Sequence, residues 1–164
     1  MSELTELHRT VVTTPDDLTI RTERVFDAPP ALVFECYTDV ETLAGWLGPD
    51  GYEMKVQEYD FRPGGEWKYL HIGPDGSEYQ FFGEFLEIEP PNRLKQTFNF
   101  IMEPQPPASI DEAEFVAIEG GRTRIVTVTT FEQQEYRDGM LQSGMEKGMN
   151  EGYNKLDLIL EQRK

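Results

Sequence analysis

The sequence predicts an α+β fold in which a curved antiparallel sheet of about seven strands packs against one long C-terminal helix. Turn-forming residues divide residues 52–131 into short stretches with strand character, and the segment after residue 132 has helical apolar periodicity. The length of 164 residues suits one domain and leaves no room for a second of ordinary size. We therefore expect a loosely held arm over residues 1–16 and a single domain over residues 17–164.

One strand and two short helices are expected before residue 48. Leu18, Ile20 and Phe26 share one parity, as in a half-buried strand, and the Ala-Pro-Pro run at residues 28–30 ends that strand and favours a helix start. The capping-box pattern at residues 38–41 predicts that a second helix begins there. The Gly-Pro-Asp-Gly run at residues 48–51 ends it.

The following residues are typical of an antiparallel meander. Turn residues separate each strand from the next, and a proline-rich stretch over residues 102–111 forms the longest connection. The expected strands cover residues 52–61, 66–72, 79–88, 93–101, 113–118 and 125–131.

A single closing helix is expected over residues 133–162, with a length of roughly 45 Å at 1.5 Å per residue. Met145, Met149, Leu156 and Ile159 form one continuous apolar face, and the Ser143-Gly144 pair predicts a kink. This face is expected to lie across the open side of the curved sheet.

Three glycines recur at four-residue spacing in this helix, namely Gly144, Gly148 and Gly152. Each costs roughly 1 kcal/mol relative to alanine in a helix interior, so the space they leave must serve a purpose. Residues at this spacing lie on one side of a helix and form a shallow groove. The groove suits either the close approach of another backbone or a cavity, and we favour the cavity.

Composition excludes several classes of partner. The formal charge of −16 comes from 31 acidic and 15 basic residues, which argues against a nucleic acid or an anionic membrane. No apolar run approaches ~18 residues, so no transmembrane helix is expected. The single cysteine, Cys36, cannot form an internal disulfide, and no signal-peptide pattern opens the chain, so a cytoplasmic location is expected.

Four separated motifs resemble one known superfamily. They are Val-Phe-Asp-Ala-Pro-Pro-Ala-Leu-Val-Phe at residues 25–34, Leu-Ala-Gly-Trp-Leu-Gly-Pro at 43–49, Asp-Phe-Arg-Pro-Gly-Gly-Glu-Trp at 60–67, and Ser-Gly-Met-Glu-Lys-Gly-Met at 143–149. In this order, and continuing through Tyr153 and Leu156, they resemble the START-like (SRPBCC, helix-grip) superfamily. The most similar branch is the one related to the C-terminal domain of the heat-shock protein 90 ATPase activator.

The resemblance covers about residues 17 to 162. It implies a helix-grip fold, in which a seven-stranded sheet wraps around the C-terminal helix and encloses a cavity that often binds a lipid-like or polycyclic molecule. It implies no single activity, because proteins of this fold include carriers, cyclases and co-chaperone domains.

Strand parity selects the residues that would line this cavity. Trp67, Tyr69 and His71 share one face of their strand, and a face with two large aromatic rings is expected to point inward. A bulge near Gly83 would exchange the faces beyond it. Trp46 is either a lid over the cavity mouth or a packed core residue. The complete predicted ligand-binding set is Trp46, Trp67, Tyr69, His71, Phe81, Phe98, Met145, Gly148, Met149, Gly152 and Tyr153.

Three functions remain open from these residues. The leading one is the binding of a small, largely apolar or lipid-like molecule without catalysis. The second is a cyclase, dehydratase or hydrolase in which His71 moves protons and Tyr69 or Glu66 assists. The third is a co-chaperone-like module that stimulates a heat-shock ATPase, and a homodimer is left open as well. His8, His71 and Cys36 show no metal-ligand spacing, so neither a metal nor another cofactor is expected.

Overall fold

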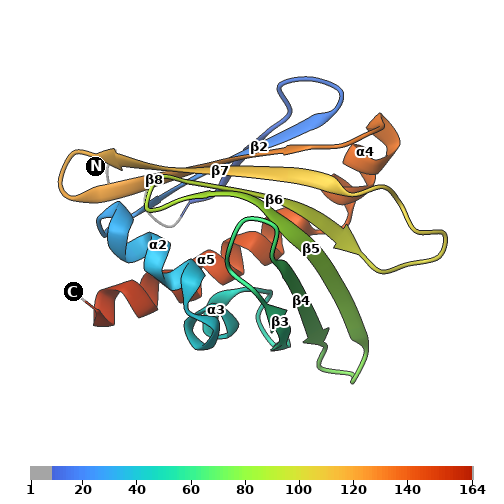
Figure 1. Ribbon diagram of the computed structural model, residues 1–164, viewed down its shortest axis with the longest axis horizontal. Helices are drawn as coiled ribbons and strands as arrows, with labels where there is room; N and C mark the ends of the chain where they lie inside the picture. Colours follow the sequence, from blue (N-terminus) through green and yellow to red (C-terminus); the bar gives the residue numbers. More distant parts are fainter. Residues whose placement is uncertain (1–8, 164) are drawn as a thin grey trace.

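A computed structural model describes residues 9–163, which form eight strands and four helices (Figure 1). The strands are β1 (Val11–Thr13), β2 (Thr19–Phe26), β3 (Glu53–Tyr59), β4 (Glu66–Ile72), β5 (Glu78–Glu89), β6 (Arg93–Phe100), β7 (Ser109–Ile118) and β8 (Arg122–Thr130). The helices are α2 (Pro30–Thr38), α3 (Val40–Trp46), α4 (Gln134–Gln142) and α5 (Met145–Gln162).

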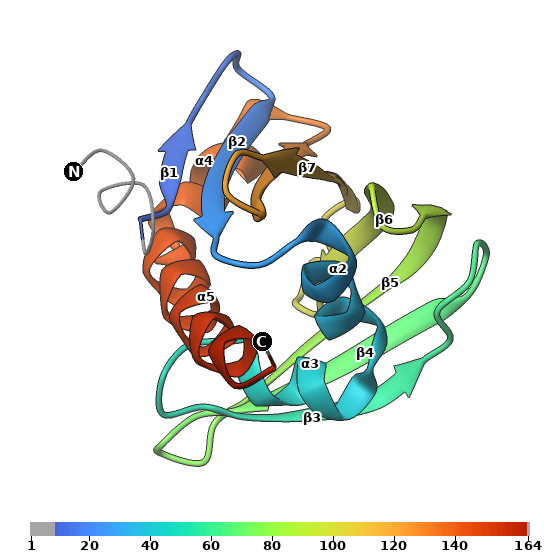
Figure 2. The ribbon, with the colours of Figure 1, turned by 90° about the vertical axis from the view of Figure 1, so that its left-hand side faces the viewer.

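All eight strands belong to one antiparallel sheet with the order β1-β2-β8-β7-β6-β5-β4-β3. The meander from β3 to β8 is confirmed, and β2 adds to its last strand. Viewed along α5, the sheet curves around this helix and around α2 (Figure 2). The α+β helix-grip fold predicted from the sequence is therefore confirmed.

Two strands differ from the expectation. Val11–Thr13, placed in the arm, form β1 and pair with β2, which brings the count to eight. The rest of the expected arm, residues 1–8, lies outside the described residues. β7 begins at Ser109 rather than at residue 113. The alternation of apolar residues does not reveal this start, because the inward-facing positions of its first half, Ser109 and Asp111, are polar.

The segment expected to form one kinked helix forms two. Gly144 has a φ of +87°, in the left-handed region, so α4 ends at Gln142 and α5 begins at Met145. Glycine adopts this conformation without steric strain, whereas residues with a Cβ are strained in it. Gly144 therefore separates two helices and does not contribute to a groove with Gly148 and Gly152.

The N-terminus of α3 also differs from the capping-box pattern. Its N-cap is Asp39 rather than Thr38, and the Asp39 side chain accepts a hydrogen bond from Thr42 Oγ1 instead of capping a backbone amide.

The interior is densely packed where α2 and the C-terminal half of α5 cover the sheet. Phe34 and Phe115 lie there with ring centroids 5.0 Å apart, and Leu156 and Leu160 of α5 are almost fully buried beside them. Figure 1 shows α2 and the end of α5 together at one end of the sheet, with the beginning of α5 toward the other end.

One buried arginine ties the sheet to α5. Arg24 of β2 is 1% exposed, and its guanidinium lies 2.7 Å from an oxygen of Asp157. It also donates to Asn154 Oδ1 at 3.0 Å and lies over the ring of Phe26. Its charge is therefore balanced inside the contact between sheet and helix.

Candidate functional site

Side chains on the concave face of the sheet are fully buried in one part and partly accessible to solvent in another. Toward the beginning of α5, several inward-facing side chains of β5 to β8 keep contact with solvent. Their common orientation follows from the register, in which Phe81 lies opposite Tyr69, and Asp111 lies opposite both Gln96 and Thr129. We call this set the open half; it comprises Phe81, Gln96, Phe98, Asp111, Thr127 and Thr129.

Aromatic rings form one wall of the open half. Trp67 is fully buried and Tyr69 is 7% exposed, and the two rings stack with centroids 4.4 Å apart. Phe98 lies 5.9 Å from Trp67 and 5.5 Å from Phe81. The prediction that these residues of β4, β5 and β6 point inward is therefore confirmed.

A glycine permits this wall to form. Trp67 lies directly opposite Gly83, and a Cβ at Gly83 would lie 2.5 Å from a ring atom of the indole. The sequence left the parity near Gly83 open, because a bulge there would exchange the faces. The structure has a bulge between Phe85 and Glu87, so Phe81 keeps the same inward orientation as Gly83 and Phe85.

The polar side of the open half was missed by sequence reasoning. Thr129 Oγ1 donates a hydrogen bond of 2.7 Å to Asp111 Oδ1, and Gln96 forms a second hydrogen bond to the same carboxylate. Burial raises the pKa of Asp111 from its ordinary 3.8 to about 6, although the residue keeps some solvent contact. Its shared parity with the apolar Ala113 and Phe115 was the one signal that could have identified it.

The negative charge of Asp111 affects the pKa values of two tyrosine side chains, one on the sheet and one on α5. Burial raises the pKa of Tyr69 on β4 and of Tyr153 on α5, and the charge of Asp111 raises both further. Interactions with Tyr37, Arg24 and Thr127 partly oppose the shift at Tyr153. Both phenols are therefore neutral near pH 7 and able to donate hydrogen bonds.

His71 lies at the edge of the aromatic wall. It is partly buried, with its ring centroid 5.0 Å from that of Phe81, and it packs against the backbone at Gly48. Burial lowers its pKa, and the positive charge of Lys155 lowers it further, so the imidazole is neutral at pH 7. Its Nε2 has no hydrogen-bond partner among the described residues. A catalytic role for His71 stays a prediction.

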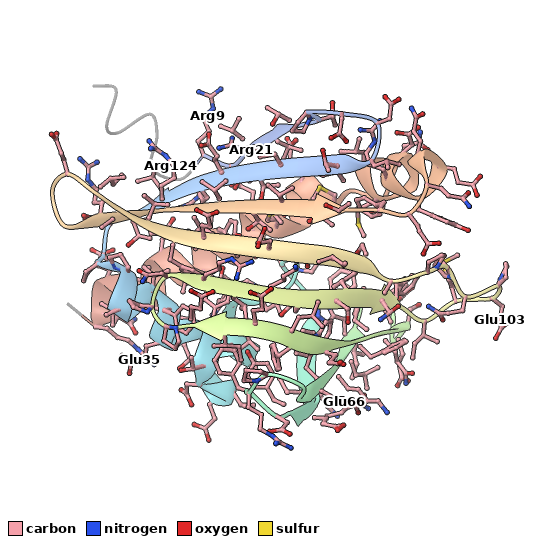
Figure 3. All side chains as sticks on the ribbon, turned by 45° about the horizontal axis from the view of Figure 1, so that its top comes forward. Arg9, Arg21, Glu35, Glu66, Glu103 and Arg124 are labelled. Atoms are coloured by element: carbon pink, nitrogen blue, oxygen red, sulfur yellow. The ribbon has the colours of Figure 1, made fainter. Side chains whose placement is uncertain are left out.

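The suggested assistance from Glu66 is wrong. Glu66 is exposed and has the opposite parity to the buried Trp67, so its carboxylate lies on the outer surface (Figure 3). Arg21 and Arg124 likewise extend from the outer side of the sheet.

Trp46 is a core residue rather than a lid. It is 2% exposed, its indole N–H donates to the Cys36 carbonyl at 3.1 Å, and its ring stacks on Tyr153 with centroids 6.1 Å apart. Of the two roles that the sequence left open for Trp46, the packed core residue is therefore correct and the lid is wrong.

Gly152 of α5 permits close contact with the chain at the end of α3, whereas Gly148 lies at ordinary contact distance from Pro49. A Cβ at Gly152 would lie 2.9 Å from the carbonyl oxygen of Trp46, and one at Gly148 would lie 3.6 Å from Pro49 Cγ. The interpretation of a cavity lined by the three glycines is wrong, because two of them face this segment and Gly144 lies outside the helix. Met145 and Met149, both partly buried, precede Tyr153 along α5.

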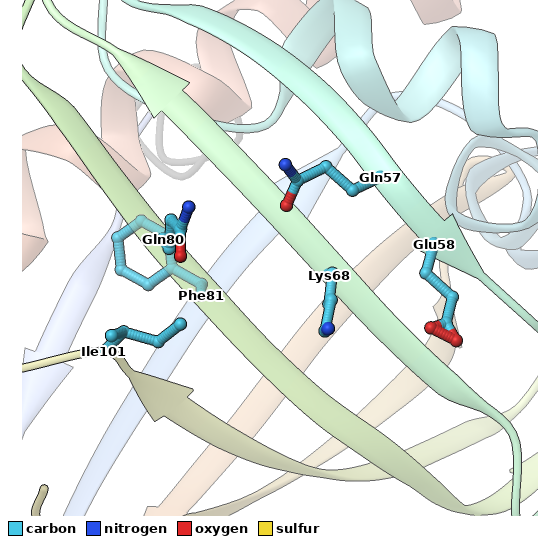
Figure 4. A pocket seen from close by; sticks show the side chains of 6 residues that line it. All are labelled: Gln57, Glu58, Lys68, Gln80, Phe81 and Ile101. Atoms are coloured by element: carbon cyan, nitrogen blue, oxygen red, sulfur yellow. The ribbon is translucent and has the colours of Figure 1, made fainter.

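A surface depression of about 440 Å³ on the sheet is lined by Gln57, Glu58, Lys68, Gln80, Phe81 and Ile101, so it shares Phe81 with the open half (Figure 4). Its lining is largely polar and includes the exposed side chains of Glu58, Lys68 and Gln80, so it is a poor match for an apolar ligand. A smaller one, of about 290 Å³, lies between Arg9 and Lys147.

Residues 9–163 contain no group of three or more His, Cys, Asp or Glu side chains arranged to hold a metal ion. Each helix in the same range is too short or too polar to cross a lipid bilayer.

Comparison with known proteins identifies a family that covers most of the domain. The sequence model of the family described as "Activator of Hsp90 ATPase homolog 1-like protein" matches residues 27–161. No curated protein matches the sequence significantly.

Solved structures from several bacteria are similar over nearly their full length. A protein from Mycobacterium smegmatis is 27% identical, with 93% of this chain and 97% of that chain covered and a TM-score of 0.83. One from Arthrobacter aurescens is 28% identical, with coverages of 93% and 91% and a TM-score of 0.82. One from Rhodobacter sphaeroides, at 23% identity, covers 95% of this chain and 100% of its own with a TM-score of 0.85, and shares the fold.

Proposed function

The chain belongs to the family described as Activator of Hsp90 ATPase homolog 1-like protein, and from this premise we propose that it binds a small, largely apolar molecule between the sheet and α5. Folds of this family are commonly ligand-binding scaffolds. The ligand would lie in the open half, against the partly accessible Phe81 and Phe98 on the sheet and Met145 and Met149 on the helix side. Phe81, Phe98 and Met149 pack against a core that includes the buried Trp67, Tyr69 and Tyr153.

One observation carries the proposal. Protein interiors are close-packed, and inward-facing aromatic side chains are normally removed from water. Phe81 and Phe98 face inward yet remain partly accessible, whereas Phe34, Phe85 and Phe115 elsewhere in the core are at most 3% exposed. Accessible apolar surface on a concave face favours occupation by an apolar molecule.

The direct test is mass spectrometry of the purified protein under non-denaturing conditions, followed by solvent extraction. We expect a co-purifying small molecule whose mass is lost after extraction. A protein that is consistently empty, and that binds no apolar probe after extraction, would contradict the proposal.

A substitution locates the ligand. Met149→Trp adds a large ring to the helix side of the open half and should lower the affinity for the extracted molecule at least tenfold. Leu158→Trp is the matched control on the same helix, because Leu158 is 62% exposed. It should leave the affinity unchanged. Equal affinities of the two variants would show that the molecule binds elsewhere.

A further inference from the structure

Asp111 is an interior carboxylate whose partners are all neutral. Thr129 and Gln96 supply its hydrogen bonds, and among the residues that the structure describes no basic side chain pairs with it. Arg24, a fully buried basic group on the same concave face, is engaged by Asp157. A carboxylate offers about four acceptor positions, so two hydrogen bonds leave it with acceptor capacity unused.

Buried ionisable groups without a balancing charge are costly, and they cluster at functional sites. Asp111 also lies beside the aromatic wall, within electrostatic range of Tyr69 on one side and Tyr153 on the other. Its position therefore combines an unbalanced negative charge with apolar and aromatic surface.

We propose that the ligand of the open half carries a protonated amine on its apolar body, and that the Asp111 carboxylate, oriented by Thr129 and Gln96, binds this amine. The proposal rests on the proposed function and names its substrate class. The amine would donate a charge-assisted hydrogen bond, which is stronger than one between neutral groups.

Three features favour an amine over an alcohol or an acid. The raised pKa of Asp111 reflects a site that lacks a cation, and a bound ammonium group would supply one. The partly accessible ring of Phe98, next to the buried Trp67, is suited to a cation at close range. The net charge of −16 attracts cationic molecules to the protein and repels anionic ones.

The test uses three probes with the same aromatic body, namely naphthylethylamine, naphthylethanol and naphthylacetate. Titration calorimetry of the full-length, ligand-extracted protein at pH 7.5 should show the amine binding at least tenfold more tightly than the alcohol, and the acid binding most weakly. Asp111→Asn should remove the preference for the amine by weakening the binding of the amine at least tenfold. Glu114→Gln, the same charge change at an exposed position of β7, is the control and should preserve the preference.

A second measurement uses the unmodified protein. The carbon-13 shift of the Asp111 carboxyl reports its titration, and saturation with the amine should lower its pKa while the alcohol should not. The groups facing this carboxyl are the phenols of Tyr69 and Tyr153 and the neutral Thr129 and Gln96, none of which titrates below pH 7. His71, at the edge of the aromatic wall, also titrates below pH 7, and the site-specific carboxyl signal distinguishes Asp111 from it.

The outcomes separate the two proposals. If the alcohol binds as tightly as the amine, or if Asp111→Asn retains the preference, the amine proposal is overturned and the proposed function stands. If the amine leaves the pKa of Asp111 unchanged, the amine proposal also fails. If none of the three probes binds, both proposals are overturned.

Discussion

At the scale of single residues, Asp111 shows how far one side chain can depart from the pattern around it. It occupies an inward position on β7 between Ser109 and Ala113, where an apolar residue would pack without cost. Its carboxylate is held by Thr129 and Gln96 instead, and its surroundings disfavour the charged form. Interior charges that destabilise the folded state are common at functional sites, where they bind a ligand or take part in a reaction.

This interpretation predicts a pH-dependent effect on stability. Below about pH 4 both folded and unfolded states hold the proton on Asp111, whereas between about pH 4 and 6 the unfolded chain loses it first. The free energy of unfolding therefore falls as pH rises through this window and stays lower above it. Asp111→Asn should raise the free energy of unfolding by about 2 kcal/mol at pH 7.5 and by little at pH 4, measured by urea unfolding.

Glu114→Gln provides the comparison, because this exposed carboxylate should produce no such difference between the two pH values. A uniform loss of stability in Asp111→Asn at both pH values would instead mean that the hydrogen bonds of the carboxyl, and not its charge, dominate.

At the scale of elements, the break between α4 and α5 is set by one glycine. Gly144 adopts a left-handed conformation with no atom within 4 Å of the position of a Cβ, so its role is conformational rather than steric. The break lets α4 turn toward β2, where Arg137 donates to the Asp16 carbonyl at 2.6 Å and the Thr19 carbonyl at 3.3 Å.

Two alanine substitutions should therefore act in opposite directions. Gly144→Ala is expected to lower the free energy of unfolding by about 1 kcal/mol, because alanine resists positive φ. Gly139→Ala, inside α4 and equally free of neighbours, should raise it by roughly 0.5 to 1 kcal/mol through helix propensity. Thermal unfolding of the two variants checks the contrast, and stabilisation by both would show that residues 142–145 can form continuous helix.

At the scale of the whole molecule, the position of α5 over the sheet depends on contacts at the middle and in the second half of the helix. Its middle lies against residues 46–48, where the absence of a side chain at Gly152 allows close approach. The ion pair of Arg24 and Asp157 joins its second half to β2. The helix begins toward the end of β6 and the start of β7 (Figure 1), the parts of the sheet that carry Phe98 and Asp111 of the open half.

Removing one member of this ion pair should weaken the whole molecule. Asp157→Ala leaves the Arg24 guanidinium buried without its counter-charge, and we expect a loss of about 3 kcal/mol in the free energy of unfolding. Arg21→Ala, on the same strand as Arg24, removes a partly exposed pair with Glu23 and should cost less than about 1 kcal/mol. Urea unfolding compares the two, and similar losses would contradict a special role for the buried pair.

Much of the fold could be predicted from local patterns. Turn residues at 62–65, 73–76 and 119–122 separate strands that alternate in polarity, and strand parity correctly placed Trp67 and Tyr69 inside. Asp111 could not be identified in the same way, because its significance depends on Gln96 and Thr129, which are distant in the sequence and become neighbours only through strand register. The purpose of Gly152 was equally hidden, since it depends on a backbone about a hundred residues away.

The sequence by itself determined the order of strands and helices, the inward face of β4 and the family, because these depend on short-range periodicity and turn chemistry. Only the tertiary structure decided that α4 and α5 are separate, that Trp46 and Gly152 serve packing, and that the concave face has an open half with a carboxylate in it. The physical reason is that burial, desolvation and close approach are properties of segments brought together from distant parts of the chain.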